Sequence, residues 1–256
     1  MKRILLFDTE DGSKTLGGES HVQKLFGCPP LKPDSWDSFG NTLVQLYVDK
    51  VFEVEKMIAG IPIMETQQKK VLKDGVEIDG IIIDTFSELS KKFQRKLVGK
   101  KSAMQMQDWG RLKMGLDDLL EKLMRIPGIV ILTCNTKIQN MDEGNEEIPY
   151  IDGSTKDDIS KWFDFVFYTF TRKVKGKEQY MWRTRHTSRY ANAKDRTNLL
   201  DDEIPQDFQL VLNAARKKDF SNCKILILGK AGTGKTQSLS TLINKEKENG
   251  DKNNVN

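Results

Sequence analysis

One stretch decides the fold: Lys224-Ile225-Leu226-Ile227-Leu228-Gly229-Lys230-Ala231-Gly232-Thr233-Gly234-Lys235-Thr236. Its first half is a continuous apolar run, which is typical of a buried β-strand. Glycines then recur within a few residues, and they predict a tight loop. The residues that follow have the apolar spacing of a helix. The sequence therefore predicts a strand, a glycine-rich loop and a helix in succession, which is a building unit of α/β folds.

The glycines and the lysine of this stretch match the P-loop pattern G-x-x-x-x-G-K-[ST] at Gly229, Gly234, Lys235 and Thr236. Glycines allow successive backbone N–H groups to turn inward around phosphate oxygens, and the helix that follows adds its positive end. We expect Lys235 to reach the β- and γ-phosphates of ATP and the Thr236 hydroxyl to ligate Mg²⁺. The alternative is a glycine turn without a ligand, but the strand before it and the helix after it favour the P-loop. The predicted nucleotide-binding residues of the loop are Gly229, Lys230, Ala231, Gly232, Thr233, Gly234, Lys235, Thr236 and Gln237.

The position of this motif in the chain is unusual. A P-loop normally opens its domain, yet only 20 residues follow Thr236, and they end in a polar, charged segment at 245–256. The remaining nucleotide-binding machinery must therefore lie upstream. We expect one domain over residues 1–244, in which 222–244 complete the sheet, and a tail at 245–256. We also expect the segment 241–256 to be exposed and to return toward Met1.

Composition sets limits on the class of protein. The chain has 256 residues, of which 38% are hydrophobic and 30% are charged, as in ordinary soluble proteins. A net charge of +4 permits a nucleic-acid partner without requiring one. No apolar run approaches the ~18 residues that a membrane span needs. Of three cysteines, Cys134 and Cys223 lie in or beside apolar strands, which favours buried thiols and a cytoplasmic location.

Three further strands are predicted upstream, at residues 3–8, 78–84 and 128–135, and each ends in polar residues. The first leads into Asp8-Thr9-Glu10-Asp11-Gly12, the second ends at Asp84, and the third ends at Thr133 and Asn135. Ligands of open α/β sheets bind at the carboxyl ends of the strands. Asp84 has the form of a Walker B aspartate, which holds the Mg²⁺ shell, and Asn135 could sense the γ-phosphate. The alternative at each position is an ordinary polar exit from a strand.

The rest of the chain predicts helices and a hairpin. Helical spacing runs over 36–54 and 109–123, strands at 163–170 and 179–185 form a hairpin, and 205–215 closes the sheet. Residues 136–160 show no strong period and are expected to form a long loop. A basic run has two interpretations, a solvated helix face or a mobile loop on a phosphate backbone, and it comprises Lys91, Lys92, Arg95, Lys96, Lys100 and Lys101.

Strands separated by helices predict an α/β fold with a mostly parallel central sheet and helices on both faces. If Asn256 is joined to Met1 and the order is read from the P-loop, the P-loop strand comes first and the strand that ends at Asp8 and Glu10 follows. The Walker B strand with Asp84, the strand with Asn135 and the hairpin come after them. That order resembles the RecA-like P-loop NTPase core, circularly permuted, and is most similar to small phage-encoded RecA-like proteins of recombination and single-strand annealing. The segments that carry the resemblance are the P-loop, 7–12 and Ala193-Lys194-Asp195-Arg196.

The resemblance implies roles for particular residues. Glu10 would polarise the attacking water, and Lys194 and Arg196 would act on the γ-phosphate of a neighbouring subunit, as an arginine finger does. Two DNA-binding loops would fall near 95–108 and 136–160, although the second is not basic in this sequence. The implied activity is ATP hydrolysis with Mg²⁺, and the implied partners are single-stranded DNA and other copies of the chain.

Two other functions fit part of the pattern. One is a DNA-annealing protein in which the nucleotide is only structural or regulatory, and it predicts no DNA-stimulated hydrolysis. The other is a P-loop kinase for a small molecule, which needs an acceptor pocket and an Arg-rich lid. The sequence shows neither feature.

Overall fold

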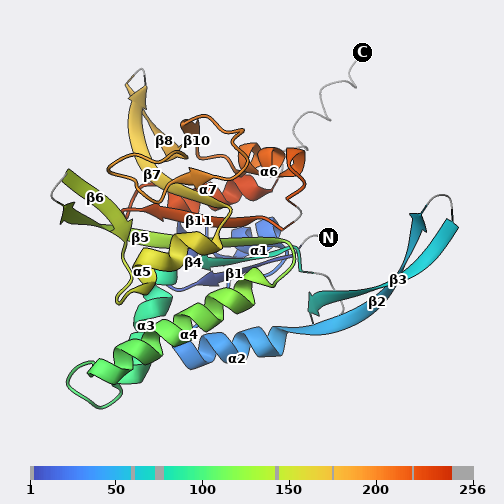
Figure 1. Cartoon of the computed structure of the whole chain (residues 1–256), viewed down its shortest axis with the longest axis horizontal. Coiled ribbons are helices and arrows are strands. Elements are labelled where there is room, and N and C mark those ends of the chain that lie inside the picture. The colour runs from blue at the N-terminus through green and yellow to red at the C-terminus, as the bar shows by residue number, and fades with distance from the viewer. Residues whose placement is uncertain are drawn as a thin grey trace.

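The computed structural model describes residues 3–58, 61–72, 78–141, 144–174, 176–220 and 222–243. Within them, a nine-stranded sheet forms the centre of the molecule (Figure 1). Its strands in spatial order are β1 (Ile4–Asp8), β4 (Gly80–Asp84), β5 (Ile129–Met141), β11 (Lys224–Gly229), β7 (Phe165–Val174), β8 (Lys177–Arg183) and β10 (Glu203–Pro205). Two short strands join from the side, β6 (Gly144–Pro149) on β5 and β9 (Lys194–Asp195) on β7.

The sheet is mostly parallel, as predicted. The pairs β1/β4, β4/β5, β5/β11 and β11/β7 are parallel, whereas β7/β8 and β8/β10 are antiparallel. Asp8 lies opposite Asp84 in the register, and Gly229 lies opposite Asn135. The parallel strands therefore end at the same edge of the sheet, which brings their polar ends together.

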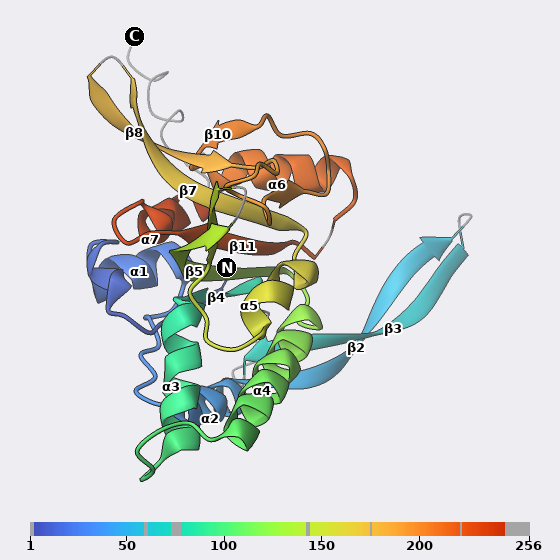
Figure 2. The same ribbon diagram turned by 60° about the vertical axis from the view of Figure 1, so that its left-hand side comes forward.

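Helices cover both faces of the sheet (Figure 2). The helices are α1 (Glu19–Phe26), α2 (Trp36–Leu46), α3 (Phe86–Val98), α4 (Met106–Met124), α5 (Thr155–Asp158), α6 (Phe208–Lys217) and α7 (Lys235–Ser238). Short 3₁₀ segments lie at Gly12–Lys14, Ile159–Trp162 and Leu239–Leu242. Alternate strand residues point to opposite faces, so each strand contributes to two cores. One core includes Ile83 and Leu228 with α3 and α4, and the other includes Ile82 and Ile227 with α1 and α6.

A two-stranded arm projects from this body. It consists of β2 (Tyr47–Ile58) and β3 (Ile61–Leu72), which pair only with each other, and both views show it extending away from the sheet (Figures 1 and 2). The sequence spacing predicted one helix over 36–54, but that prediction is wrong beyond Leu46. Apolar residues at helical spacing continue across this boundary, while β-branched and aromatic residues in 47–58 favour a strand.

Two other predictions need correction. Residues 136–160 are not one long loop, because β5 continues to Met141 and pairs with β6, and α5 follows. Residues 205–215 do not extend the sheet beyond Pro205, because α6 begins at Phe208. The Asp207 side chain caps α6 by accepting a hydrogen bond from the Gln209 backbone N–H at 2.8 Å. The predicted hairpin is present as β7 and β8.

The buried thiols are also as predicted, since Cys134 and Cys223 are both buried. The tail at 245–256, and with it most of the predicted return of 241–256 toward Met1, lies outside the described residues. Among the residues that the structure describes, no helix has the length and apolar character needed to cross a membrane.

Candidate active site

The glycine loop lies between β11 and α7, at the carboxyl edge of the parallel strands. Gly232 and Gly234 have φ values of 79° and 85°, which L-residues with a side chain rarely adopt. A Cβ on Gly229 would lie 1.7 Å from the Thr169 hydroxyl oxygen, and one on Gly234 would lie 2.9 Å from the Tyr180 ring. Glycine is therefore required at these positions both for loop geometry and for contact with the β7–β8 hairpin.

Lys235 is buried and folds back on its own loop. Its Nζ donates hydrogen bonds to the backbone oxygens of Gly229 and Lys230, both at 2.8 Å. Burial lowers the pKa of the Lys235 ammonium, and the nearby Asp84 carboxylate opposes that effect. The two carbonyls hold the ammonium group until a stronger anionic partner, such as a phosphate, becomes available.

Asp84 lies at the end of β4, directly beside the P-loop. The Thr236 hydroxyl donates to its Oδ2 at 2.6 Å, and the Thr133 hydroxyl donates to its Oδ1. Burial raises the pKa of the Asp84 carboxyl, while these two hydrogen bonds and the charge of Lys235 lower it. The Walker B aspartate and the P-loop threonine, predicted from segments about 150 residues apart, are therefore in direct contact.

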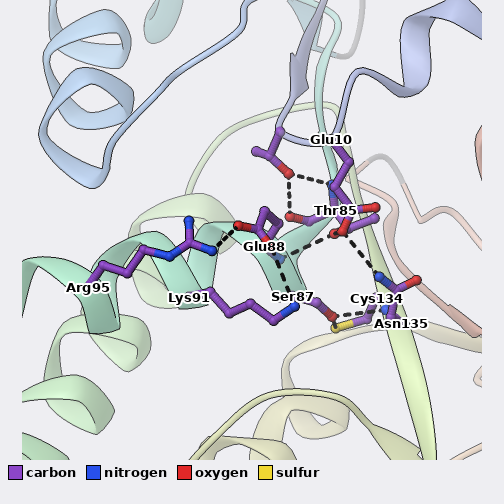
Figure 3. A network of polar contacts seen from close by, with 9 residues as sticks. Glu10, Thr85, Ser87, Glu88, Lys91, Arg95, Cys134 and Asn135 are labelled. Carbon is purple, nitrogen blue, oxygen red and sulfur yellow. Dashed lines mark hydrogen bonds and ion pairs between the residues drawn. The ribbon is translucent and has the colours of Figure 1, made fainter. Parts of the chain in front are cut away.

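Glu10 follows β1 on a loop that Asp8 organises. The Asp8 carboxylate accepts hydrogen bonds from the backbone N–H groups of Gly12 at 2.7 Å and Ser13 at 2.9 Å. Glu10 Oε1 accepts hydrogen bonds from the Thr85 hydroxyl at 2.8 Å and from Asn135 Nδ2 at 3.2 Å (Figure 3). A carboxylate held by two donors has a fixed orientation, as a general base requires.

Asn135 is itself held in place from α3. Its backbone N–H donates to the Ser87 hydroxyl at 2.9 Å, and the Ser87 hydroxyl contacts the Cys134 sulfur at 3.3 Å (Figure 3). This arrangement anchors the end of β5 beside Glu10. The amide of Asn135 is therefore positioned to contact both the carboxylate and a ligand in the site.

These groups surround one cavity of about 330 Å³. Of the predicted site residues, those that line it are Glu10, Asp84, Asn135, Ala231, Gly232, Gly234, Lys235, Thr236 and Gln237. Gly229, Lys230 and Thr233 do not line the cavity but stabilise the loop. The carbonyls of Gly229 and Lys230 accept hydrogen bonds from Lys235, and the Thr233 hydroxyl shares a hydrogen bond with the Thr169 hydroxyl. The predicted convergence of Glu10, Asp84 and Lys235 on one space is therefore present, while their chemical roles stay predictions.

The residues of the cavity fit a nucleotide with Mg²⁺. The glycine loop, in which Gly232 has open space where a Cβ would lie, has the form of a cradle for phosphate groups. In the described part of the chain, no three His, Cys, Asp or Glu residues come together as a metal site. Mg²⁺ is usually held by one or two protein groups together with substrate phosphates and water. The Thr236 hydroxyl and the Asp84 carboxylate, which are in contact, match that requirement.

Lys194 and Arg196 do not lie in this cavity. They are on and just after β9, which pairs with the first residues of β7, at the edge of the sheet opposite to the P-loop. Lys194 Nζ donates to the Ser160 carbonyl at 2.7 Å, and Arg196 pairs with Asp164 at 2.8 Å. Lys194 and Arg196 were predicted to act in the active site of a neighbouring subunit. Their location within a single chain does not test that role, which stays a prediction.

The sequence interpretation missed four residues of the cavity, which are Gly12, Thr15, Thr85 and Tyr180. Thr85 caps α3 and orients Glu10, and its spacing to Glu88, T-x-x-E, is a helix-capping pattern that could have drawn attention to it. Gly12 lines the cavity, and a Cβ there would lie 2.9 Å from Asp84 Oδ2. Tyr180 comes from β8, and no local pattern marks it, because only the folding of the hairpin over the P-loop brings it there.

Comparison with known proteins gives one match. The model of the AAA domain family matches residues 1–197, and the match ends before the P-loop. No curated protein matches the chain, and no solved structure matches it. The matched segment contains β1, β4 and β5, with Glu10, Asp84 and Asn135 at their carboxyl ends. Because the match covers 197 of the 256 residues and the P-loop completes the same site, the chain belongs to the AAA domain family of P-loop ATPases.

Proposed function

We propose that this chain is a RecA-like ATPase that hydrolyses ATP in an assembly on single-stranded DNA, with recombination or strand annealing as its task. One observation supports it above the others. Glu10, Asp84 and Lys235, which lie at or shortly after the ends of three separate strands, line the same cavity as the glycine loop. A phosphate cradle, a metal-shell carboxylate and an oriented general base are the parts that hydrolysis of a nucleoside triphosphate needs.

Each residue has a distinct task in the proposed reaction. Lys235 leaves the carbonyls of Gly229 and Lys230 and binds phosphate oxygens, and the glycine-loop N–H groups bind the remainder. Thr236 and Asp84 are the residues that would hold Mg²⁺, which would neutralise charge on the phosphates. Glu10 accepts a proton from the attacking water, because Thr85 and Asn135 fix its Oε1 and leave Oε2 for that role.

The proposal includes a circular permutation of the RecA-type order. Two observations support it. β11, which carries the P-loop, comes last in sequence among the described strands but lies between β5 and β7 near the middle of the sheet. The AAA domain match also ends at residue 197, so the P-loop follows a segment that it would otherwise precede.

The proposal also places Lys194 and Arg196 in the site of a neighbouring subunit. Its test is to mix two inactive variants, Lys235→Ala, which lacks a working P-loop, and Arg196→Ala, which lacks the finger. An Arg196→Ala subunit beside a Lys235→Ala subunit has all its parts, so a random 1:1 mixture regains about a quarter of wild-type turnover. A mixture no more active than its components would contradict action across subunits.

The experiment that tests the function as a whole is ATP hydrolysis with and without single-stranded DNA. We expect measurable turnover that the DNA increases, and we expect Lys235→Ala to abolish nucleotide binding. Hydrolysis that does not respond to DNA would favour a nucleotide that is only structural or regulatory. Phosphate transfer to a small-molecule acceptor would favour a P-loop kinase.

A further inference from the structure

A basic and aromatic cluster lies on the surface beside the network of Glu10. It consists of Tyr150, Lys91, Lys137 and Arg95, and we call it the Tyr150 cluster. The Nζ atoms of Lys91 and Lys137 lie 5.0 Å and 5.4 Å from the centroid of the Tyr150 ring. Tyr150 is 40% exposed, and the Arg95 side chain is 67% exposed. Ammonium groups at these distances are attracted to the ring face, which keeps ring and cations together.

Two cations of this cluster, Lys91 and Arg95, form ion pairs with a carboxylate of the protein itself. Glu88, in the first turn of α3, pairs with Arg95 at 3.0 Å and with Lys91 at 3.4 Å (Figure 3). The spacing Thr85-x-x-Glu88 would normally send the Glu88 carboxylate back to the Thr85 backbone N–H. That N–H instead donates to the Thr9 hydroxyl at 2.8 Å. Glu88 is therefore free to hold two cations in the way that a phosphate group would.

Two chains of hydrogen bonds join the cluster to Glu10 Oε1. In the first, the Glu88 backbone N–H donates to the Thr85 hydroxyl at 3.3 Å, and that hydroxyl donates to Glu10. In the second, the Tyr150 backbone N–H donates to the Asn135 carbonyl at 2.6 Å, and the Asn135 side chain donates to Glu10. A displacement of either Glu88 or Tyr150 therefore reaches the same carboxylate oxygen through one intermediate residue.

The other basic residues of α3 have different partners. Lys92 donates to the Asp34 carbonyl at 3.4 Å, and Lys96 pairs with Asp37 at 2.5 Å. These lysines tie α3 to the segment at the start of α2, and neither contacts the Tyr150 ring. The four residues of the basic run that lie on α3 thus divide into a structural pair, Lys92 and Lys96, and a pair that belongs to the Tyr150 cluster, Lys91 and Arg95.

We infer that the Tyr150 cluster binds single-stranded nucleic acid and reports its presence to Glu10. A base stacks on the Tyr150 ring, and phosphates take Lys91 and Arg95 from Glu88 while Lys137 binds alongside. Exposed aromatic rings between cations are the platform that single strands use, because only unpaired bases offer an open face. The inference rests on the proposed function, and it adds the surface and the path by which the strand acts on the site.

Binding of a fluorescent dT oligomer of about 16 nucleotides, measured by anisotropy at several salt concentrations, tests the surface. We expect Tyr150→Leu to weaken binding about tenfold, and Lys91→Ala and Arg95→Ala to reduce the salt slope by about 0.7 each. Lys92→Ala and Lys96→Ala remove the same charge from the same helix and should change affinity little. Glu88→Gln removes the internal competitor, so it should bind the oligomer several-fold more tightly, whereas Glu121→Gln on α4 should not.

ATP hydrolysis by the same variants tests the path to Glu10. Lys91→Ala and Arg95→Ala should lose most of the stimulation by the oligomer, measured as the ratio of the rates with and without it, because each variant already frees Glu88 from one cation before the oligomer is added. If these variants match Lys92→Ala and Lys96→Ala while the wild type still binds the oligomer, the inference is wrong and the proposed function stands. If the wild type hydrolyses ATP but binds no oligomer, both the inference and the DNA part of the proposed function fail. Equally tight binding of a poly-Glu peptide that Tyr150→Leu removes would assign the cluster to an acidic protein partner instead.

Discussion

Glu10 is the residue on which the proposed chemistry depends most. Its Oε1 is held by Thr85 and Asn135, so the carboxylate has one orientation in the cavity. We predict that Glu10→Gln keeps nucleotide binding but lowers the turnover number about 10²- to 10⁴-fold, because an amide cannot accept the proton of the attacking water. Phosphate release and titration with a fluorescent ATP analogue measure the two quantities separately.

The matched control for this prediction is Asp11→Asn. Asp11 is an adjacent exposed carboxylate that pairs with Lys14 and Lys32, so the variant has the same charge change without the contacts of Glu10. Normal turnover by Glu10→Gln would show that another group activates the water.

Lys224 provides a pH-dependent test of stability away from the cavity. It is buried at the start of β11, and its Nζ donates to the carbonyls of Ile126 at 2.6 Å and Gly128 at 3.2 Å. Burial lowers the pKa of Lys224 from 10.5 to about 8. Between these two values the unfolded chain holds the proton and the folded chain has released it. The stability contribution of Lys224 is therefore present above pH 10.5 and is lost as the pH falls through 8.

We predict that the free energy of unfolding of the wild type, relative to Lys224→Met, rises by at most about 3 kcal/mol from pH 7 to pH 10.5. Urea unfolding at the two pH values measures this difference. Lys122→Met, which removes an exposed lysine of α4, should show no such rise. A constant difference between wild type and Lys224→Met would mean that Lys224 keeps its ordinary pKa.

At the scale of single elements, α4 contains a matched pair of glycines. Gly110 has no atom within 4 Å of the position where a Cβ would be, whereas a Cβ on Gly115 would lie 2.3 Å from the Phe93 ring. We predict that Gly110→Ala stabilises the protein by about 0.5–1 kcal/mol through helix propensity. Gly115→Ala should destabilise it by about 1–3 kcal/mol, because it overpacks the α3–α4 contact. Thermal unfolding of both variants measures the pair, and the same sign for both would contradict the packing described.

The elements that the sequence alone predicted are those whose own residues form a recognisable pattern, either a short apolar run or a helical period. β1, β4 and β11 are short apolar runs, and the spacing of leucines in α4 has a clear helical period. The β2–β3 arm was missed because residues 47–54 continue the apolar spacing of α2, and their pairing with the next strand in the sequence makes them extended. β6 was missed for a related reason, since its sequence does not alternate between apolar and polar residues and only its pairing with β5 makes it extended.

The candidate site was predictable where its residues belong to a local motif, and not where tertiary contacts bring them together. Each of its motifs ends a predicted strand, and the register of parallel strands brings those ends together. Tyr180 and the contact between Glu88 and the cations depend on how a hairpin and a helix face fold over the strands, which no local pattern records.

At the scale of the whole molecule, the order of the strands is the main feature. We predict that a rearranged chain, which begins at Asn222, joins Asn256 to Met1 and ends at residue 221, still binds ATP. The cut falls between α6 and β11, and the join falls after the segment Leu239–Leu242 and before β1. Isothermal titration with ATP compares it with the original chain. Loss of binding by a soluble, folded rearranged chain would contradict the proposed permutation.

The central place of β11 has a consequence for biosynthesis. The ribosome makes β5 and β7 well before it reaches β11, the strand that must lie between them. At about 5–20 residues per second, the nascent chain spends seconds with two unpaired inner strand edges. Unpaired edges are templates for pairing with other chains, so we expect the growing polypeptide to be most prone to aggregation before β11 emerges.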